Sequence, residues 1–127
     1  MAQASTILVV DDEAALQRLI ARVLGQAGLE VVAVGDGDAA AAALEKQPDR
    51  FGAVVLDGTV PPAGGAEALR GLLARKPDLG VVLTSGADLD PPLRTLLREC
   101  AGVFLAKPFS PDALVDAVQQ ALARGDI

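Results

Sequence analysis

Five short runs of consecutive apolar residues, each followed by a segment with helical spacing, constrain the fold of this chain more than any other feature. Continuous apolar runs of four or five residues are typical of strands buried on both faces of a parallel sheet. Right-handed crossovers between parallel strands then leave few topologies. The alternation therefore predicts a doubly wound α/β fold with five parallel strands in the order 2-1-3-4-5. The five runs cover residues 6–10, 31–34, 53–56, 81–85 and 103–106.

The segments between these runs carry helix signals. Apolar residues from Leu16 to Ala27 recur at steps of three and four, and Gly28 follows as a C-cap. Asp90 followed by Pro91 supplies an N-cap and a first-turn proline. The other helices are expected from Ala39 to Lys46, around 66–73 and after Ser110.

Length and composition exclude several classes of protein. A chain of 127 residues forms about one domain, predicted here as a single unit over 1–127 with its core at about 6–124 and no output domain. A net charge of −6 opposes direct binding to nucleic acid or to anionic lipid. The absence of His removes the commonest metal ligand and general base. A single Cys, with neither a signal peptide nor a membrane span in the sequence, predicts a cytoplasmic protein.

Carboxylates stand where two of the predicted strands end. Asp11 and Asp12 follow the first strand, and Asp57 ends the third. Taken alone, Asp11-Asp12 is explained by a solvated turn or a helix N-cap, and Asp57 by a surface acid. In the predicted strand order, however, these ends meet at the switch point of the sheet, where doubly wound folds bind ligands. Three converging carboxylates need a cation, and an all-oxygen ligand set suits Mg2+ together with phosphate.

Two more polar residues end strands at the same predicted edge. Lys107 follows the fifth strand and would suit an anion held over Asp57, although a solvated loop charge is the alternative. Thr84 lies near the end of the fourth strand and offers a hydroxyl, although a buried strand threonine is the commoner reading in isolation.

Together these residues resemble the receiver domain of bacterial two-component response regulators. The resemblance rests on Asp11-Asp12, on Asp57 with Pro61 and Gly65 beyond it, on Thr84-Ser85 and on Lys107-Pro108-Phe109. It spans about residues 6–124 and implies a flavodoxin-like (βα)5 fold. It also implies a phosphorelay signalling domain rather than a turnover enzyme, with a histidine kinase or histidine phosphotransfer protein as its partner.

The resemblance assigns roles to individual residues. Asp57 would be the phosphoacceptor, and Asp11, Asp12, Asp57 and the main-chain carbonyl of Thr59 would bind Mg2+. Lys107 would pair with the phosphoryl group, and Thr84 would move to hydrogen-bond it. Phe104 matches the family's switch aromatic, and a cis peptide bond is expected between Lys107 and Pro108.

The sequence departs from the usual family pattern near Asp57. Gly58 replaces a more common apolar residue, and Gly64 replaces a frequent acid. Thr59 and Gly86 fall at positions that in this family tune the lifetime of the phosphoryl group. Neither offers an acid or amide to align an attacking water, so slow self-hydrolysis is predicted.

Other functional classes also fit parts of the sequence. The runner-up is a Mg2+-dependent phosphatase or phosphotransferase of doubly wound fold, and a third is a receiver-like scaffold that is not phosphorylated. Residues 35–40 match a G-x-G-x-x-A dinucleotide signature, but Asp36 and Asp38 are better explained by helix capping. Asp57-Gly58-Thr59 resembles haloacid-dehalogenase phosphatases, but Val55 stands where their nucleophile belongs. A homodimer through the last helix region is left open.

Overall fold

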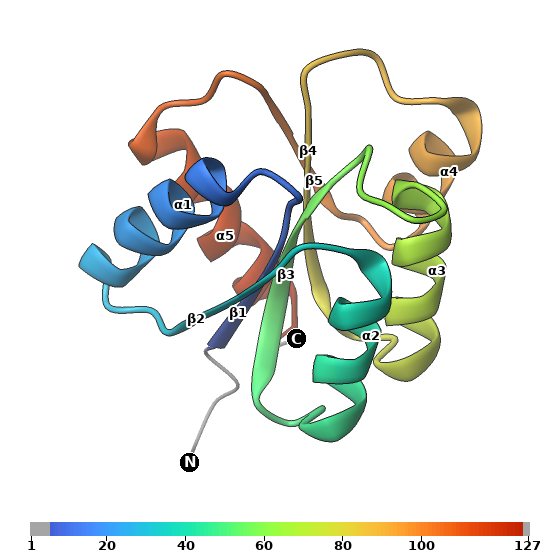
Figure 1. Cartoon of the computed structure of the whole chain (residues 1–127), viewed down its shortest axis with the longest axis horizontal. Helices are drawn as coiled ribbons and strands as arrows, with labels where there is room; N and C mark the ends of the chain where they lie inside the picture. Colours follow the sequence, from blue (N-terminus) through green and yellow to red (C-terminus); the bar gives the residue numbers. More distant parts are fainter. Residues whose placement is uncertain (1–5, 126–127) are drawn as a thin grey trace.

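The computed structural model describes residues 6–125, with side chains described up to residue 123. Strands and helices alternate along this part of the chain, as the sequence predicts (Figure 1). The strands are β1 (Thr6–Val10), β2 (Val31–Val34), β3 (Phe51–Asp57), β4 (Gly80–Ser85) and β5 (Val103–Ala106). The helices are α1 (Ala14–Gln26), α2 (Gly37–Lys46), α3 (Gly65–Arg75), α4 (Pro91–Glu99) and α5 (Pro111–Gly125). None of the described helices is long and apolar enough to cross a bilayer.

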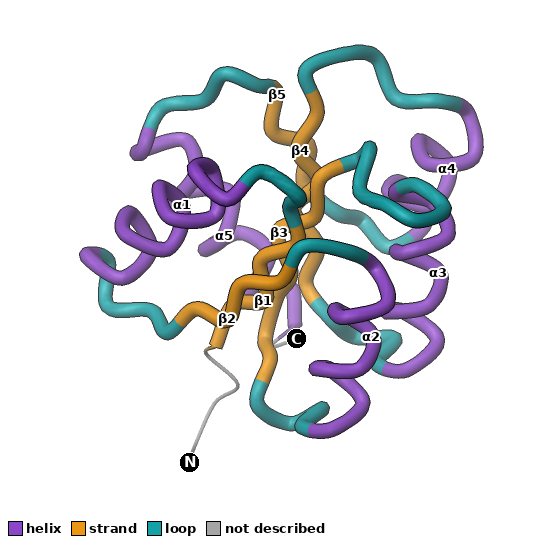
Figure 2. The backbone as a smooth tube through the Cα atoms, viewed as in Figure 1, coloured by secondary structure: helices purple, strands orange, loops and turns teal. Residues whose placement is uncertain are grey.

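The strands form one parallel sheet in the order β2-β1-β3-β4-β5, which confirms the predicted topology (Figure 2). The central strands β1, β3 and β4 are buried along their length, whereas the edge strands β2 and β5 are partly exposed. The order changes direction between β1 and β3, so the loops after these two strands diverge and open a crevice at their carboxyl ends.

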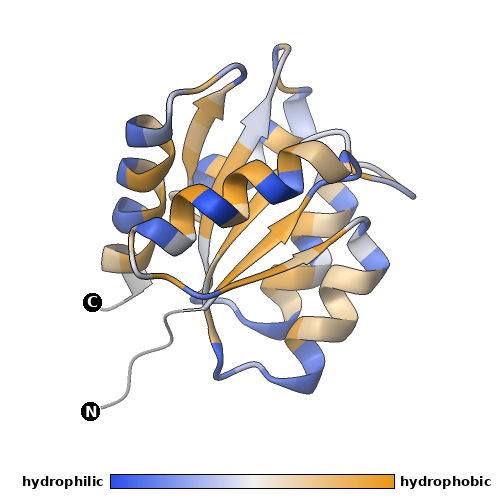
Figure 3. Ribbon diagram, turned by 60° about the vertical axis from the view of Figure 1, so that its left-hand side comes forward, coloured by the Kyte–Doolittle hydropathy of each residue, from blue (hydrophilic) through white to orange (hydrophobic). Residues whose placement is uncertain are grey.

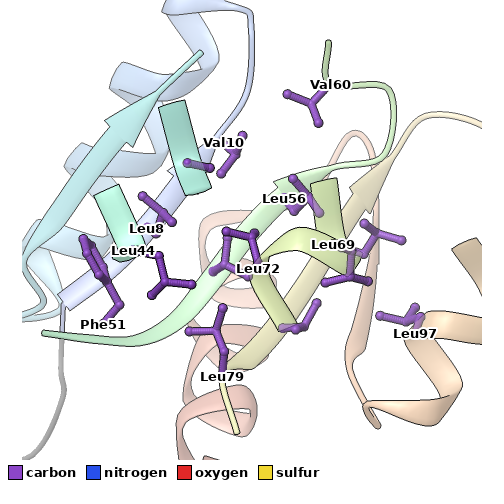
Figure 4. Close-up of a cluster of buried hydrophobic side chains, with 14 of the residues drawn as sticks. Leu8, Val10, Leu44, Phe51, Leu56, Val60, Leu69, Leu72, Leu79 and Leu97 are labelled. Carbon is purple, nitrogen blue, oxygen red and sulfur yellow. The ribbon is translucent and has the colours of Figure 1, made fainter. Parts of the chain in front are cut away.

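Helices cover both faces of the sheet, with α1 and α5 on one side and α2, α3 and α4 on the other (Figure 1). Figure 3 shows the strands as mainly hydrophobic ribbons between helices whose hydropathy alternates around the axis. The α2–α4 side packs leucines and valines from β1, β3 and β4 against Leu44, Leu69 and Leu72 (Figure 4). The opposite side packs Ile7, Val9 and Val55 against helices α1 and α5. The core is therefore largely aliphatic, and Phe51 is the one aromatic side chain among the buried core residues that the structure describes.

Local capping explains where several helices begin and end. Asp36 accepts a hydrogen bond from the Ala39 amide at 2.7 Å, so this aspartate caps α2. This agrees with the sequence interpretation that Asp36 caps a helix and does not belong to a dinucleotide site. Asp90 accepts from the Leu93 amide at 3.1 Å and caps α4. Gly28, with φ of 88°, closes α1 in the left-handed conformation that favours glycine.

Two elements begin earlier in the chain than the sequence predicted. Strand β3 begins at Phe51, two residues before the apolar run that predicted it, because Thr6 and Phe51 extend the pairing of β1 with β3. Helix α2 begins at Gly37 rather than at Ala39, because Asp36 supplies its cap from further upstream. Neither shift moves the carboxyl ends of the strands, where the predicted site lies.

Candidate functional site

Three carboxylates converge at the carboxyl ends of β1 and β3. One carboxylate oxygen from each of Asp11, Asp12 and Asp57 lies within 4.8 Å of the others. Asp57 ends β3 and is only 4% exposed, Asp11 directly follows β1 and is 2% exposed, and Asp12 is exposed. The crevice predicted from the strand order therefore brings these side chains together.

Lys107 reaches into the same cluster from the end of β5. Its Nζ lies 3.4 Å from Asp11 Oδ2 and 3.5 Å from Asp57 Oδ1. Its backbone amide donates to the Ser85 carbonyl at 2.9 Å, and the peptide bond to Pro108 is cis, as expected. One lysine facing three carboxylates leaves an excess of negative charge at the crevice mouth, which favours binding of a cation.

Thr59 contacts both oxygens of Asp57. The Thr59 amide donates to Asp57 Oδ1 at 3.3 Å, and its hydroxyl donates to Oδ2 at 3.2 Å. These bonds fix the orientation of the buried carboxylate. The sequence drew attention to Thr59 for its carbonyl and its position, but nothing in the sequence pointed to this hydroxyl contact, which depends on the turn after β3.

Thr84 lies beside Asp57, because the register of β3 and β4 pairs these two residues. Thr84 is buried, with only 1% of its surface exposed. Its hydroxyl can donate a hydrogen bond to a group that arrives at the neighbouring carboxylate.

Phe104 lies one strand further along the sheet, where β5 pairs it with Leu83. Its side chain is 44% exposed, which is unusual for a large apolar residue in this compact core. It borders a hollow of about 400 Å³ lined also by Lys107 and by the loop from Ser85 to Asp88, which includes Gly86. The ring therefore adjoins a space that it could fill after a small movement of that loop.

Glycines shape the turn after Asp57. The Gly65 amide donates to the Gly58 carbonyl at 3.0 Å, and a Cβ on Gly65 would lie 2.6 Å from that oxygen. Gly64 has φ of 90°, which favours glycine. At Gly58, a Cβ would approach Leu93 Cδ2 to 3.3 Å, so this glycine lets α4 pack closely on the backbone beside Asp57. A second cis bond, between Pro61 and Pro62, was not predicted.

Gln17 in α1 also belongs to the site, although it was not predicted from the sequence. Its Nε2 donates to the carbonyl of Asp11 and, at 3.1 Å, to the carbonyl of Val34. It therefore joins the loops that follow β1 and β2. A single polar residue on an otherwise apolar helix face carries no pattern that reveals such a contact.

The arrangement combines a buried, oriented carboxylate with an all-oxygen donor set and one ammonium group. Oxygen donors of this kind bind hard cations such as Mg2+. A carboxylate can act as a nucleophile toward phosphorus once surrounding positive charge neutralises the phosphoryl oxygens. The site can therefore hold a divalent cation and present Asp57 to a phosphoryl group.

Comparison with known proteins agrees with this geometry. Residues 7–119 match the family model described as the response regulator receiver domain. The chain is 37% identical over 116 residues to the C4-dicarboxylate transport transcriptional regulatory protein DctD of Pseudomonas aeruginosa, and 33% identical over 123 residues to the probable transcriptional regulatory protein TcrX of Mycobacterium tuberculosis. These matches cover 91% and 96% of this chain but 25% and 51% of the relatives, so the chain spans about a quarter to a half of their length.

Solved structures show the same fold. A CheY-like response regulator receiver domain protein from Methanospirillum hungatei superposes with a TM-score of 0.86 over 96% of both chains at 20% identity. NtrX from Brucella abortus superposes with a TM-score of 0.85 at 31% identity, covering 97% of this chain and 28% of that one.

Proposed function

The chain belongs to the response regulator receiver domain family of two-component signalling, and we propose that it receives its phosphoryl group on Asp57. The observation that carries this proposal is the position of Asp57. It is the one carboxylate of the cluster that ends a strand, is buried, and is held by both the amide and the hydroxyl of Thr59. The nucleophile is thus oriented before any phosphodonor arrives.

The donor set around Asp57 fits Mg2+. Asp11, Asp12 and Asp57 would supply carboxylate oxygens, and the main-chain carbonyl of Thr59 would complete the protein ligands. Mg2+ usually takes one or two carboxylates and keeps waters and phosphate oxygens in its remaining positions. When bound, it would neutralise charge on the phosphoryl oxygens.

The transfer itself needs little beyond alignment and charge. An Asp57 carboxylate oxygen forms a bond to phosphorus, the P–N bond of a phosphohistidine breaks, and its electron pair stays on the imidazole nitrogen. Lys107, already 3.5 Å from Asp57, is placed to pair with a phosphoryl oxygen. The donor that fits this chemistry is a histidine kinase or a histidine phosphotransfer protein.

An apolar surface beside the crevice suits the docking of such a donor. Leu19 in α1 is 47% exposed and lies with Leu16 and Phe109 around a hollow of about 320 Å³ that Lys107 also borders. A donor that covers this surface would bury apolar area and exclude water beside Asp57. The net charge of −6 disfavours nucleic acid as a direct partner.

Phosphorylation would be communicated through Thr84 and Phe104. The Thr84 hydroxyl would donate to the phosphoryl group and draw the loop after β4 toward Asp57. The hollow bordered by that loop would then accept the Phe104 ring, which is now exposed. Two packings of one ring, biased by one new hydrogen bond, make a two-state switch.

We propose a signalling module that undergoes only self-phosphorylation and slow self-dephosphorylation. Thr59 and Gly86, the positions that tune lifetime in the family, present no acid or amide to an attacking water, and the Thr59 hydroxyl already bonds Asp57. The phosphoryl half-life should be much longer than seconds. A half-life of seconds, measured by loss of the phosphoryl mass shift from the intact protein, would contradict this part of the proposal.

Replacing Asp57 with Asn tests the assignment. Acetyl phosphate with Mg2+ should label the parent protein and Asp88→Asn, which changes an exposed aspartate in the nearby loop after β4, and should not label Asp57→Asn. Equal labelling of Asp57→Asn would refute the assignment. Repeated consumption of acetyl phosphate without a lasting adduct would instead favour the phosphatase reading.

Beryllofluoride with Mg2+ provides a second test. It should shift the amide resonances of Thr84 and Phe104 in a working receiver domain and leave them unchanged in a scaffold that is not phosphorylated. The single-domain organisation of the sequence, a homodimer through the last helix region and a cytoplasmic location remain predictions from the sequence.

A further inference from the structure

The two carboxylates after β1 are held in different ways. Asp11 accepts from the Glu13 amide through Oδ1 and pairs with Lys107 through Oδ2. Asp12 is exposed, and its carboxylate forms no hydrogen bond or ion pair with the described residues. The position of the Asp12 side chain therefore depends on the backbone that carries it.

That backbone is fastened by Gln17. The carbonyl of Asp11 belongs to the peptide that joins Asp11 to Asp12, and it accepts from Gln17 Nε2. The end of the Gln17 side-chain amide faces two carbonyl oxygens, those of Asp11 and Val34. Because carbonyl oxygens only accept hydrogen bonds, the amide nitrogen must point toward them. The orientation of the Gln17 amide is thus fixed by its neighbours.

The second bond of Gln17 ties this peptide to the sheet. Nε2 donates to the Val34 carbonyl at 3.1 Å, and the same carbonyl accepts from the Asp11 backbone amide at 3.1 Å. The loop after β1 is therefore anchored to the end of β2 by its own amide and by a helix side chain. Rotation of the peptide between the two aspartates would break the Gln17 bond.

We infer that Gln17 is a positioning residue for the cation site, acting through the peptide between Asp11 and Asp12. The inference rests on the proposed function, because it requires that these carboxylates bind Mg2+. In the absence of the cation the two like charges repel each other, and a free peptide would let Asp12 swing away. The Gln17 amide is neutral, so it holds Asp12 near Asp57 without changing the net charge of the site.

Replacing Gln17 with Met tests this role, since Met keeps the length and helix propensity of Gln but has no donor. Mutating a residue that orients metal ligands without binding the metal itself commonly lowers metal affinity by about 10–100-fold, so the Kd for Mg2+ should rise about tenfold. Gln17→Arg, which restores donors at the same place, should recover most of the affinity. Gln26→Met, an exposed residue at the end of the same helix, should bind Mg2+ as the parent does.

Calorimetric titration of each intact variant with MgCl2 gives the Kd, because the sequence has no Trp or Tyr to report it by fluorescence. Urea unfolding without Mg2+ shows whether a variant is merely unstable. An unchanged Kd in Gln17→Met, or a loss that Gln17→Arg fails to recover, would overturn the inference while leaving the proposed function intact. If the parent and Gln26→Met also fail to bind Mg2+, the cation site itself is wrong and the inference falls with it.

Discussion

At the scale of single residues, the crevice combines like charges that oppose folding with one lysine that relieves them. Asp11 and Asp57 each have Lys107 as a partner, whereas Asp12 adds a negative charge without a partner among the described residues. Sites that must accept a cation or a phosphoryl group are often arranged at such a cost in stability. The cost should be measurable by removing charges one at a time.

Asp12→Asn should stabilise the metal-free protein. It removes repulsion from two nearby carboxylates and breaks no bond with a described residue, so the free energy of unfolding should rise by about 1 kcal/mol, the order of magnitude for exposed charges this close. Urea unfolding in EDTA measures the change. Asp49→Asn, at an exposed turn far from the crevice, controls for the loss of one net charge and should change little. A loss of stability in Asp12→Asn alone would show that its carboxylate has a stabilising role.

Lys107→Met should have the opposite effect. It leaves the buried carboxylates of Asp11 and Asp57 without a cation, which should lower the free energy of unfolding in EDTA by about 1–3 kcal/mol. Added Mg2+ should restore part of this loss, since a bound cation stabilises the folded state by mass action. Lys46→Met, an exposed lysine at the end of α2, is the matched control. Unfolding curves of Lys107→Met and Lys46→Met that coincide would mean that the ion pairs contribute nothing.

At the scale of elements, helix ends show how closely local sequence and conformation agree. Helix α1 ends with Gly28 in the left-handed region, and Leu29 donates back to the Leu24 carbonyl. Helix α4 ends with the same bonding pattern, in which Gly102 donates to Leu97, but Ala101 occupies the left-handed position with φ of 52°. An alanine there is strained where glycine would not be.

Ala101→Gly should therefore stabilise the protein by up to about 1 kcal/mol. The same exchange at Ala42, an exposed residue within α2, should destabilise it by about 1 kcal/mol, because glycine is unfavourable inside a helix. Thermal or urea unfolding of the two variants compares them directly. Two variants that are destabilised equally would contradict the strain attributed to Ala101.

At the scale of the whole molecule, the sequence predicted the fold because each strand is a continuous apolar run and each crossover is short. The predicted strand order was then enough to bring Asp11, Asp12 and Asp57 together at one edge of the sheet. Gln17 and the hydroxyl of Thr59 escaped prediction, because their contacts depend on how a helix and a turn approach the strand ends. The exposure of Phe104 was also not predicted, because an apolar residue within an apolar strand is expected to be buried.

Strand β5 lies at the edge of the sheet and pairs only with β4, whereas β1, β3 and β4 have strands on both sides. The backbone amides of β5 should therefore exchange with solvent roughly tenfold faster, or more, than those of the three central strands. This strand carries Phe104 and leads to Lys107, so one of the two edges of the sheet holds two of the proposed switch residues. Beryllofluoride with Mg2+ should slow exchange in β5 as Phe104 packs.

The opposite edge supplies the control for this experiment. Strand β2 also pairs with a single neighbour but carries none of the proposed phosphoryl-binding or switch residues. Hydrogen exchange measured residue by residue should therefore show rapid exchange at both edges and a response to beryllofluoride mainly in β5. An equal response at β2 would indicate general tightening of the fold, and no response in β5 would separate Phe104 from events at Asp57. The comparison of two edges in one molecule thus distinguishes a directed switch from simple stabilisation by a bound ligand.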